Sequence, residues 1–323
     1  MSGKSGQYDE PLLNADMRYT PNTAAYWRSM GRTIFDEWII YPDDVPDSYS
    51  QDYSEELIPE NNMISWSWKA NPFISNGKRR WQINYSFHSD DKWTSHDEEH
   101  REKIRNGLQK MEDQTCLTFV EQNKDFPDYP GGLMRFVSAY GCWTTIGRDP
   151  MPRDSPNNLI SLGESCTGIG TIHHEVMHSL GVGHEQGRFD RDDHVDVHWD
   201  NIQETYLSQF NKVDEDRWVD MKVPYDFHSV MQYGGNSFQI NKDEPTISYK
   251  RDGHQIKKGD PVENKGGMGS FGMSSMDVYQ LCKMYECETC AHRDIPTYEG
   301  KAYENYMYQC KKSRMVSYIS ELI

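Results

Sequence analysis

The sequence predicts an α+β fold in which a mixed, twisted sheet packs on two main helices. Residues 81–87 alternate apolar and polar side chains as a strand does, and residues 116–122, 133–138 and 158–163 are further short strand candidates. Residues 95–113, and a histidine-bearing stretch that begins near residue 170, have helical character instead. Regular signals are sparse after residue 188, so we expect a mostly irregular lower subdomain, with a last short helix over 274–285.

The first predicted helix, residues 95–113, has Ser95 as its expected cap and acidic residues in its first turn. One face is apolar and is formed by Ile104, Leu108 and Met111. We interpret this helix as a structural element that backs the sheet. His96 and His100 are therefore expected to be solvated rather than metal-bound.

The second predicted helix carries the string HEVMHSLGVGHE, residues 174–185. His174 and His178 are four residues apart, so their imidazoles project from one helix face and can bind one metal ion. His184 cannot share that face, so the helix must end before it. Gly181 can adopt the left-handed backbone that ends a helix and turns His184 toward the metal. Three neutral imidazoles leave a fourth position open for water, as in a catalytic zinc site.

Glu175 directly follows the first predicted ligand. From this position its carboxylate can reach a zinc-activated water, whose pKa the metal lowers to about 7, and can act as general base. A bare HExxH also occurs by chance in helices that bind nothing, whereas the extended HExxHxxGxxH string fixes several identities together. His173 faces away from the ligand stripe, so we interpret it as a hydrogen-bonded core or rim histidine.

A second motif, SVMQY at residues 229–233, follows the zinc helix along the chain. Together with HEVMHSLGVGHE it resembles the signature of the astacin family of secreted zinc endopeptidases, a branch of the metzincins. Five further blocks resemble the family in family order: TCLTF (115–119), GCWTTIGR (141–148), LISLG (159–163), RDDHV (191–195) and WDNI (199–202). The resemblance implies a metzincin-like zinc protease whose sheet and two main helices lie above an active-site cleft.

The resemblance also implies roles for single residues. The zinc ligands would be His174, His178 and His184, and Glu175 would be the catalytic base. Tyr233 would be a further zinc ligand at rest that swings away to stabilise the oxyanion when substrate binds.

Two more residues would support this site. Met231 would form its floor, and Glu185 would hold the new amino terminus after activation. The chain departs from the family pattern at Gln232, where His is usual, and at Gly183, where an aromatic residue is usual. Neither departure removes a catalytic group.

The chain has 7 cysteines. The resemblance implies two disulfides, Cys142 with Cys166 and Cys116 with Cys287. The pairing of the other three stays open: Cys282, Cys290 and Cys310. Because their number is odd, one is either unpaired or bonded to another chain.

The resemblance divides the chain into a propeptide-like segment at 1–69, a catalytic domain at 70–287 and a tail of unknown role at 288–323. The zinc-blocking FxGD motif of family propeptides is absent, and Glu60 and Asp36 stay open as candidates for that role. For activation we favour cleavage near Lys69 and Ala70. Cleavage after Arg80, in a basic stretch, is the alternative.

Composition limits the partners. A net charge of -17 and a pI near 5.1 argue against nucleic acid and against anionic membranes, since both would repel the chain. No run of about 20 apolar residues is present, so we expect no membrane span. The first six residues are polar and show no secretory signal. The cysteines fit an oxidising compartment, so we expect a secreted protein, and a cytosolic protein with reduced thiols is the alternative.

These features predict a secreted zinc-dependent endopeptidase with one catalytic Zn²⁺, made as a zymogen, that cleaves proteins or peptides. In the family, the edge strand near the Cys142 block pairs with an extended substrate. A zinc-stabilised binding protein without turnover is the alternative from another class, but a binder needs neither Glu175 nor Tyr233. Membership of another metzincin branch is a weaker alternative. Glu185 and the blocks around Cys116 and Cys142 argue against it. The oligomeric state stays open.

Overall fold

The computed structural model describes residues 17–18, 68, 72–89, 94–122, 132–148, 158–213, 223–250, 259, 261–262, 271–291 and 293–294. Most of the predicted propeptide-like segment, including Asp36 and Glu60, lies outside the described residues, as do Lys69, Ala70 and Cys310. Within the described residues, no helix has the length and apolar character needed to cross a bilayer.

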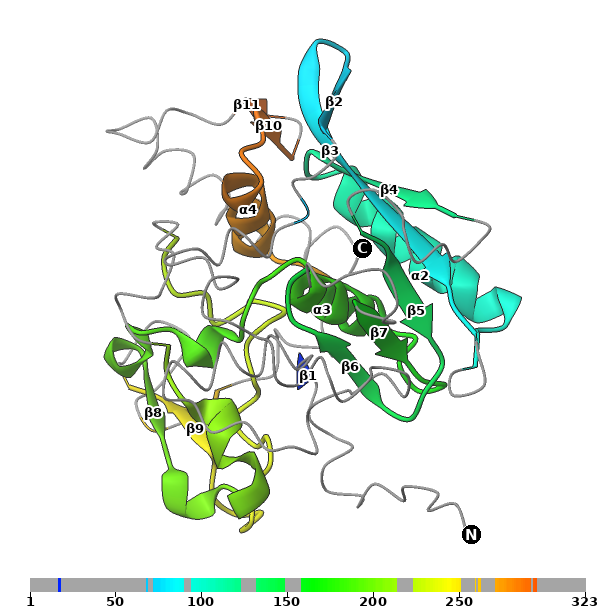
Figure 1. The fold of residues 1–323 in the computed structure, drawn as a ribbon. Helices are drawn as coiled ribbons and strands as arrows, with labels where there is room; N and C mark the ends of the chain where they lie inside the picture. The colour runs from blue at the N-terminus through cyan, green and yellow to red at the C-terminus, as the bar shows by residue number, and fades with distance from the viewer. Residues whose placement is uncertain are drawn as a thin grey trace, which may run out of the picture.

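A mixed sheet forms the core of the upper half of the domain (Figure 1). Its strand order is β1-β6-β7-β5-β3-β2, and β4 also pairs with β3. The bounds are β1 Met17–Arg18, β2 Pro72–Ser75, β3 Lys78–Phe87, β4 Leu117–Glu121, β5 Met134–Val137, β6 Cys142–Thr145 and β7 Leu159–Leu162. The β3, β4, β5 and β7 strands run parallel, whereas β6 is antiparallel to β7. The predicted mixed sheet is therefore confirmed.

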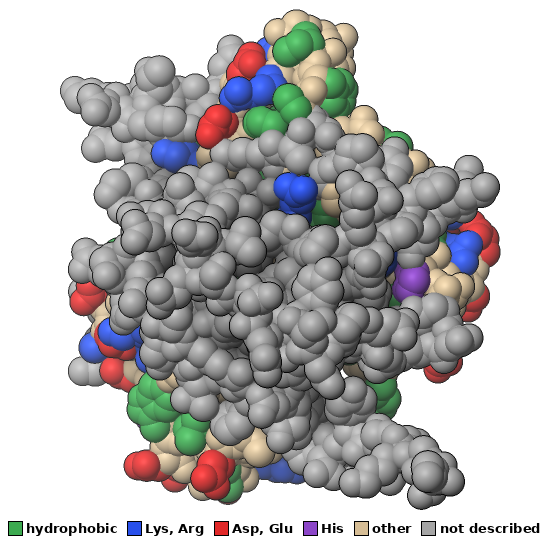
Figure 2. Space-filling model, in the orientation of Figure 1, with side chains coloured by type: hydrophobic (Ala, Val, Ile, Leu, Met, Phe, Trp, Pro, Cys, Tyr) green, Lys and Arg blue, Asp and Glu red, His purple; other side chains and the backbone are tan. Residues whose placement is uncertain are grey.

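Strand β3 starts at Lys78, earlier than the predicted start at residue 81. The reason is a hairpin with β2, which turns at Asn76 and Gly77, both with positive φ of 52° and 76°. Asn-Gly is the preferred pair for such a tight turn. The hairpin projects from the sheet in Figure 1, and Figure 2 shows hydrophobic side chains beside charged ones at this end of the molecule. Ile74 of β2 is 70% exposed there.

Helix α2, Glu98–Glu112, backs the sheet as predicted, but its expected cap is wrong. Asp97 caps the helix by accepting the His100 N–H at 2.8 Å, whereas Ser95 accepts a hydrogen bond from Arg101. The expected solvation of His96 and His100 is also wrong, because both side chains are buried. His96 Nε2 lies 2.8 Å from the Leu162 carbonyl oxygen of β7, so the entry to the helix is packed on the sheet.

Helix α3, Ile169–Ser179, packs on β6, β7 and α2 and carries the histidine motif. A Cβ on Gly107 of α2 would lie 2.6 Å from Ile172 Cγ2, so the two helices approach closely at this glycine. His173 lies in the same contact, with Nε2 3.1 Å from the Gly107 carbonyl oxygen and Nδ1 accepting the Met273 N–H at 3.0 Å. Its prediction as a hydrogen-bonded core histidine is confirmed.

The lower half of the domain, described over residues 185–213 and 223–250, is mostly irregular, as predicted (Figure 1). These described residues include four short 3-10 helices, Glu185–Gly187, Arg191–Asp193, Trp199–Asn201 and Glu204–Phe210, and a small sheet, β8 Val195–Val197 with β9 Ile247–Tyr249. It has its own aromatic core, which includes Tyr206, Phe210 and Tyr233. Helix α4, Ser275–Met284, then begins after a capping box at Ser274, and β10 Thr289–Cys290 pairs with β11 Arg293–Asp294.

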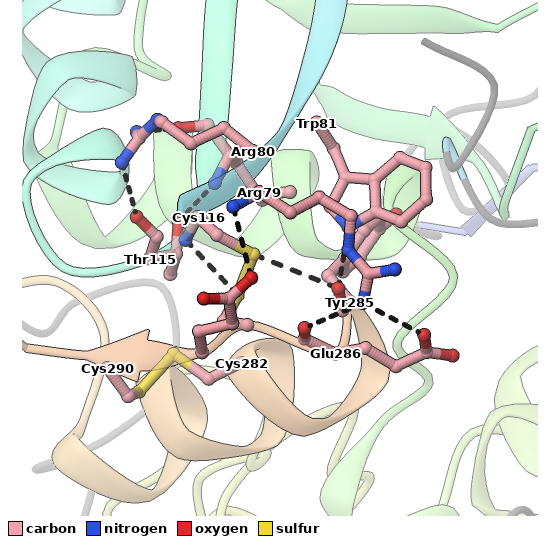
Figure 3. The surroundings of a disulfide bond; sticks show 12 residues. Arg79, Arg80, Trp81, Thr115, Cys116, Cys282, Tyr285, Glu286 and Cys290 are labelled. Carbon is pink, nitrogen blue, oxygen red and sulfur yellow. Dashed lines mark hydrogen bonds and ion pairs between the residues drawn. A yellow bond between two sulfur atoms is a disulfide. The ribbon is translucent and has the colours of Figure 1, made fainter. Parts of the chain in front are cut away.

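Three disulfides join these elements within the described residues. Cys116–Cys287 and Cys142–Cys166 are the two pairs that the resemblance implies. Cys282 pairs with Cys290, which the sequence left open, and this bond ties the end of α4 to β10 (Figure 3). Figure 3 also shows Trp81 and Tyr285 beside Cys116, and the Trp81 indole N–H donates to the Tyr285 carbonyl at 2.6 Å.

Candidate metal centre

Three buried histidines converge where helix α3 ends. His174 and His178 lie on successive turns of α3, and the chain then turns at Gly181, whose φ is +98°. This turn brings His184 back, and one ligand nitrogen from each of the three side chains lies within 4.8 Å of the others. Among the described residues, this is the only cluster of three or more His, Cys, Asp or Glu side chains close enough to hold one metal ion.

The ring orientations fit a metal ion. His174 Nδ1 lies 2.6 Å from the Val230 carbonyl oxygen, and His178 Nδ1 lies 2.7 Å from that of Val182. A carbonyl oxygen only accepts, so both Nδ1 atoms carry the proton and both Nε2 atoms are left as ligands. The Nε2 atoms of His178 and His184 are 3.1 Å apart. Two nitrogens around one tetrahedral zinc are separated by about 3.3 Å. The donor set therefore fits zinc, with one position left for a further ligand.

The Met turn, Ser229 to Met231, lies against this cluster. Gln232 donates its N–H to the Ser229 carbonyl at 3.1 Å, which closes the turn, and Met231 is buried. The Val230 carbonyl contacts His174, as described, and the Met231 carbonyl accepts the Glu185 N–H at 3.0 Å. The turn thus touches the chain at the first ligand and directly after the third.

Glu175 and Tyr233 flank the histidines. Glu175 is fully buried on α3 beside His174. The Tyr233 ring lies 4.3 Å, centroid to centroid, from the His184 ring, and its backbone N–H donates to the Gln186 side chain at 3.1 Å. Gln232, which stands where the resemblance leads one to expect a histidine, accepts a hydrogen bond from the Tyr225 hydroxyl at 2.6 Å. This bond connects the Met turn to the lower half of the domain.

Glu185 is buried beside the centre. One carboxylate oxygen accepts the Asp226 N–H at 2.8 Å and lies 3.4 Å from the Arg188 guanidinium. Burial raises the pKa of the Glu185 carboxyl to about 8, although Arg188 lowers it. The buried carboxylate therefore has two partners among the described residues, the Asp226 N–H and the Arg188 guanidinium.

Sequence reasoning missed the buried acids behind the Met turn. Asp277, in the first turn of α4, accepts the Val230 N–H at 2.9 Å and the Ser229 hydroxyl at 2.5 Å. Asp226 accepts the Ser274 hydroxyl at 2.5 Å. The sequence signal for Asp277 was a capping pattern, a serine followed three residues later by an acid.

Strand β6 has partners on both edges. One edge pairs with β7, and the other pairs in parallel with the backbone of Met17 and Arg18, which form β1. The second edge is the one that the resemblance assigns to an extended substrate.

Comparisons with known proteins agree with this fold and centre. Residues 73–286 match the family model described as Astacin, a peptidase family. The chain is 38% identical over 170 residues to meprin A subunit alpha of Mus musculus, covering 52% of this chain and 21% of that protein. It is 30% identical over 295 residues to zinc metalloproteinase dpy-31 of Teladorsagia circumcincta, covering 88% of this chain and 45% of that protein. The chain thus spans less than half the length of these curated relatives.

A solved structure is similar over the same region. High choriolytic enzyme 1, a hatching enzyme zinc-protease from Oryzias latipes, aligns with a TM-score of 0.54 and 26% identity, over 71% of this chain and 98% of that chain.

Proposed function

The chain belongs to the astacin family of peptidases, and from this premise we propose that it is a zinc-dependent endopeptidase that cleaves proteins or peptides. The observation that carries the proposal is the convergence of His174, His178 and His184, with Glu175 on the same helix between the first two. A merely zinc-stabilised binding protein needs the three ligands but has no use for a buried carboxylate beside them.

The three imidazoles would hold one zinc ion, and the Tyr233 phenol would be a further ligand at rest. When bound, zinc supplies a Lewis acid that lowers the pKa of water to about 7 and polarises a carbonyl. The backbone carbonyls of Val230 and Val182 keep the ligand rings of His174 and His178 in the required tautomer and orientation.

Two side chains would carry the proton and charge transfers. The Glu175 carboxylate would accept the proton of the attacking water and deliver it to the leaving amine nitrogen as the peptide bond breaks. The Tyr233 hydroxyl would donate a hydrogen bond to the oxyanion that develops on the scissile carbonyl. The packing of its ring against His184 supports this role, because it keeps the phenol beside the ligand cluster.

We further propose that the protein is secreted and made as a zymogen. The three disulfides support an oxidising compartment. The pairing of β1 with β6 supports an inhibitory amino-terminal segment, because its backbone takes the edge groups that an extended substrate would use. In the processed form, Glu185 would hold the new terminal ammonium group.

The test is hydrolysis of a quenched fluorescent peptide library by the enzyme after its activation from the full-length chain, with and without a zinc chelator, beside Glu175→Gln. We expect the variant to keep one equivalent of zinc and to lose at least about a hundredfold of the activity, as removal of a general base does. Chelation should abolish the activity, and added zinc should restore it. A processed protein with bound zinc and intact disulfides that hydrolyses nothing would support the binding protein instead.

A further inference from the structure

We propose that Asp277 of helix α4 is a positioning residue for the zinc ligand His174, and that it acts through the backbone of the Met turn. The inference deepens the proposed function and rests on it. Asp277 lies in a different element from the ligands and follows His174 by about a hundred residues along the chain.

The Asp277 carboxylate is almost completely buried and accepts three hydrogen bonds. Oδ1 accepts the Ser229 hydroxyl at 2.5 Å. Oδ2 accepts the backbone N–H groups of Val230 at 2.9 Å and Ser274 at 2.7 Å. The Ser229 hydroxyl oxygen in turn accepts the Met231 N–H at 3.0 Å. The carboxylate is therefore the group that ties the start of α4 to the Met turn.

The same turn residue links this carboxylate to the ligand. Val230 gives its N–H to Asp277 and its carbonyl oxygen to His174 Nδ1, at 2.6 Å. A shift of the Val230 backbone would therefore move the acceptor that fixes the His174 ring. The Met231 carbonyl holds the Glu185 N–H, next to His184, so the turn steadies the chain at two of the three ligands.

The hydrogen bonds at this position favour a carboxylate. Two of its partners, the Val230 and Ser274 N–H groups, can only donate, and the Ser229 hydroxyl donates here as well. An amide would place its NH₂ group on Ser229 and force the hydroxyl proton to turn away from the side chain at residue 277. Burial, followed by the nearby charge of Asp226, raises the pKa of Asp277 to about 6. Keeping an acid in the core costs desolvation energy that an apolar side chain would avoid. A helix cap alone would use only the bond to Ser274.

The alternative is that Asp277 only caps α4. Ser274 separates the two roles, because its hydroxyl accepts the Asp277 N–H at 2.8 Å and takes no part in the contact with the turn. Ser274→Ala removes this capping bond and the hydrogen bond from the Ser274 hydroxyl to Asp226, and leaves the Asp277 carboxylate on Val230 and Ser229. Asp277→Asn keeps the side-chain size and disturbs the contact with the turn.

The experiment uses the full-length, disulfide-bonded protein, processed to its active form for the kinetic measurement, and compares wild type, Asp277→Asn and Ser274→Ala. Zinc dissociation constants are measured by competition with a chelator, and the visible spectrum of the Co²⁺ form reports the ligand geometry without turnover. We expect Asp277→Asn to bind zinc about tenfold to a hundredfold more weakly, to change the Co²⁺ spectrum and to lower kcat more than it raises KM. Ser274→Ala should lower Tm but leave the zinc affinity and the Co²⁺ spectrum unchanged.

Ser229→Ala is the second variant, in case Asp277→Asn does not fold. It removes one of the two contacts with the turn, so it should weaken zinc binding in the same direction and by less. A folded Asp277→Asn or Ser229→Ala with wild-type zinc affinity and Co²⁺ spectrum would overturn the proposal. So would an equal loss of zinc affinity in Ser274→Ala. A processed wild type that binds zinc without turnover would refute the proposed function, and the zinc measurements would still decide the role of Asp277.

Discussion

Four of the buried histidines differ in what their ring nitrogens face. In His174 and His178 one nitrogen faces a backbone carbonyl and the other lies in the ligand cluster. In His173 both nitrogens bond to backbone, at Gly107 and Met273, so none is left for a metal. His96 also lies outside the cluster and bonds to the Leu162 carbonyl, which makes it a structural histidine.

The burial of His96 makes stability depend on pH. Desolvation lowers the pKa of His96 to about 4, from an ordinary value of 6.5. Between pH 6.5 and 4 the His96 imidazole is protonated in the unfolded chain and neutral in the folded one. The stability that is present above pH 6.5 is therefore lost as the pH falls toward 4. The contribution of this one side chain is about 3 kcal/mol across that window.

The check is the free energy of unfolding, from chemical denaturation at several pH values, in His96→Gln and in the exposed-site control His198→Gln. Glutamine can still donate to the Leu162 carbonyl but does not titrate. We expect His96→Gln to flatten the pH dependence by about 3 kcal/mol and the control to retain it. Zinc release at low pH affects both variants alike. Parallel curves for the two variants would contradict the assignment.

At this scale the sequence predicts the ligand residues but not what orients them. The three histidines and Glu175 belong to one short string whose geometry depends on a helix and one glycine. Val230, by contrast, lies 56 residues from His174 and contributes a backbone carbonyl, which any residue type could supply. Its role is therefore invisible without the fold.

Among the elements, the turn after α3 decides whether His184 reaches the cluster. Gly181 has φ of +98°, and a Cβ there would lie 2.9 Å from Met284 Cε. A non-glycine residue in the left-handed region costs about 1–2 kcal/mol. We expect Gly181→Ala to lose that much stability and also zinc affinity, because any relaxation of the turn displaces His184.

Gly183 is the matched control for this turn. It lies two residues further in the same motif, and a Cβ there would meet nothing within 4 Å. Gly183→Ala should therefore change the free energy of unfolding by less than about 0.5 kcal/mol and leave zinc binding unchanged. Denaturant unfolding and chelator competition measure both quantities. The argument fails if the two variants behave alike.

The elements themselves were predicted best where periodicity is strong. The strands at 116–122, 133–138 and 158–163 and both main helices are present. The start of β3 was misplaced because residues 78–80 are basic and carry no alternation, and only the Asn76-Gly77 turn indicates the hairpin. The cap of α2 was misplaced because Ser95 and Asp97 are both good caps, and the packing of His96 on β7 decides between them.

For the whole molecule, one residue of the predicted propeptide-like segment belongs to the core. Trp68 is 1% exposed, and its indole N–H donates to the Ser179 carbonyl at 2.8 Å. Its backbone N–H donates to the Tyr285 hydroxyl at 3.3 Å, and that hydroxyl donates to the Leu180 carbonyl at 3.1 Å. Trp68 and Tyr285 thus satisfy carbonyls that the end of the zinc helix leaves open.

This arrangement bears on where the chain can be processed. Cleavage near Lys69 and Ala70 would separate Trp68 from the domain whose core it fills. Cleavage after Arg80 would also cut the β2–β3 hairpin. The Arg80 guanidinium donates to the Thr118 hydroxyl at 2.8 Å. It also donates to the Thr115 carbonyl at 3.2 Å (Figure 3). Both cleavages would remove packed structure, so the contacts of Trp68 favour a third position, on the amino-terminal side of Trp68.

We therefore expect the active enzyme to begin before Trp68. The measurement is amino-terminal sequencing and intact mass of the species that gains activity from the full-length chain. The companion variant Trp68→Phe keeps an aromatic ring but leaves the Ser179 carbonyl without its donor, which should cost about 1–3 kcal/mol of stability and lower Tm by several degrees in the processed enzyme. An active species that starts at Ala70 or Trp81 would contradict the expectation. So would a processed Trp68→Phe enzyme with unchanged Tm, because the indole contact at the end of the zinc helix would then be dispensable.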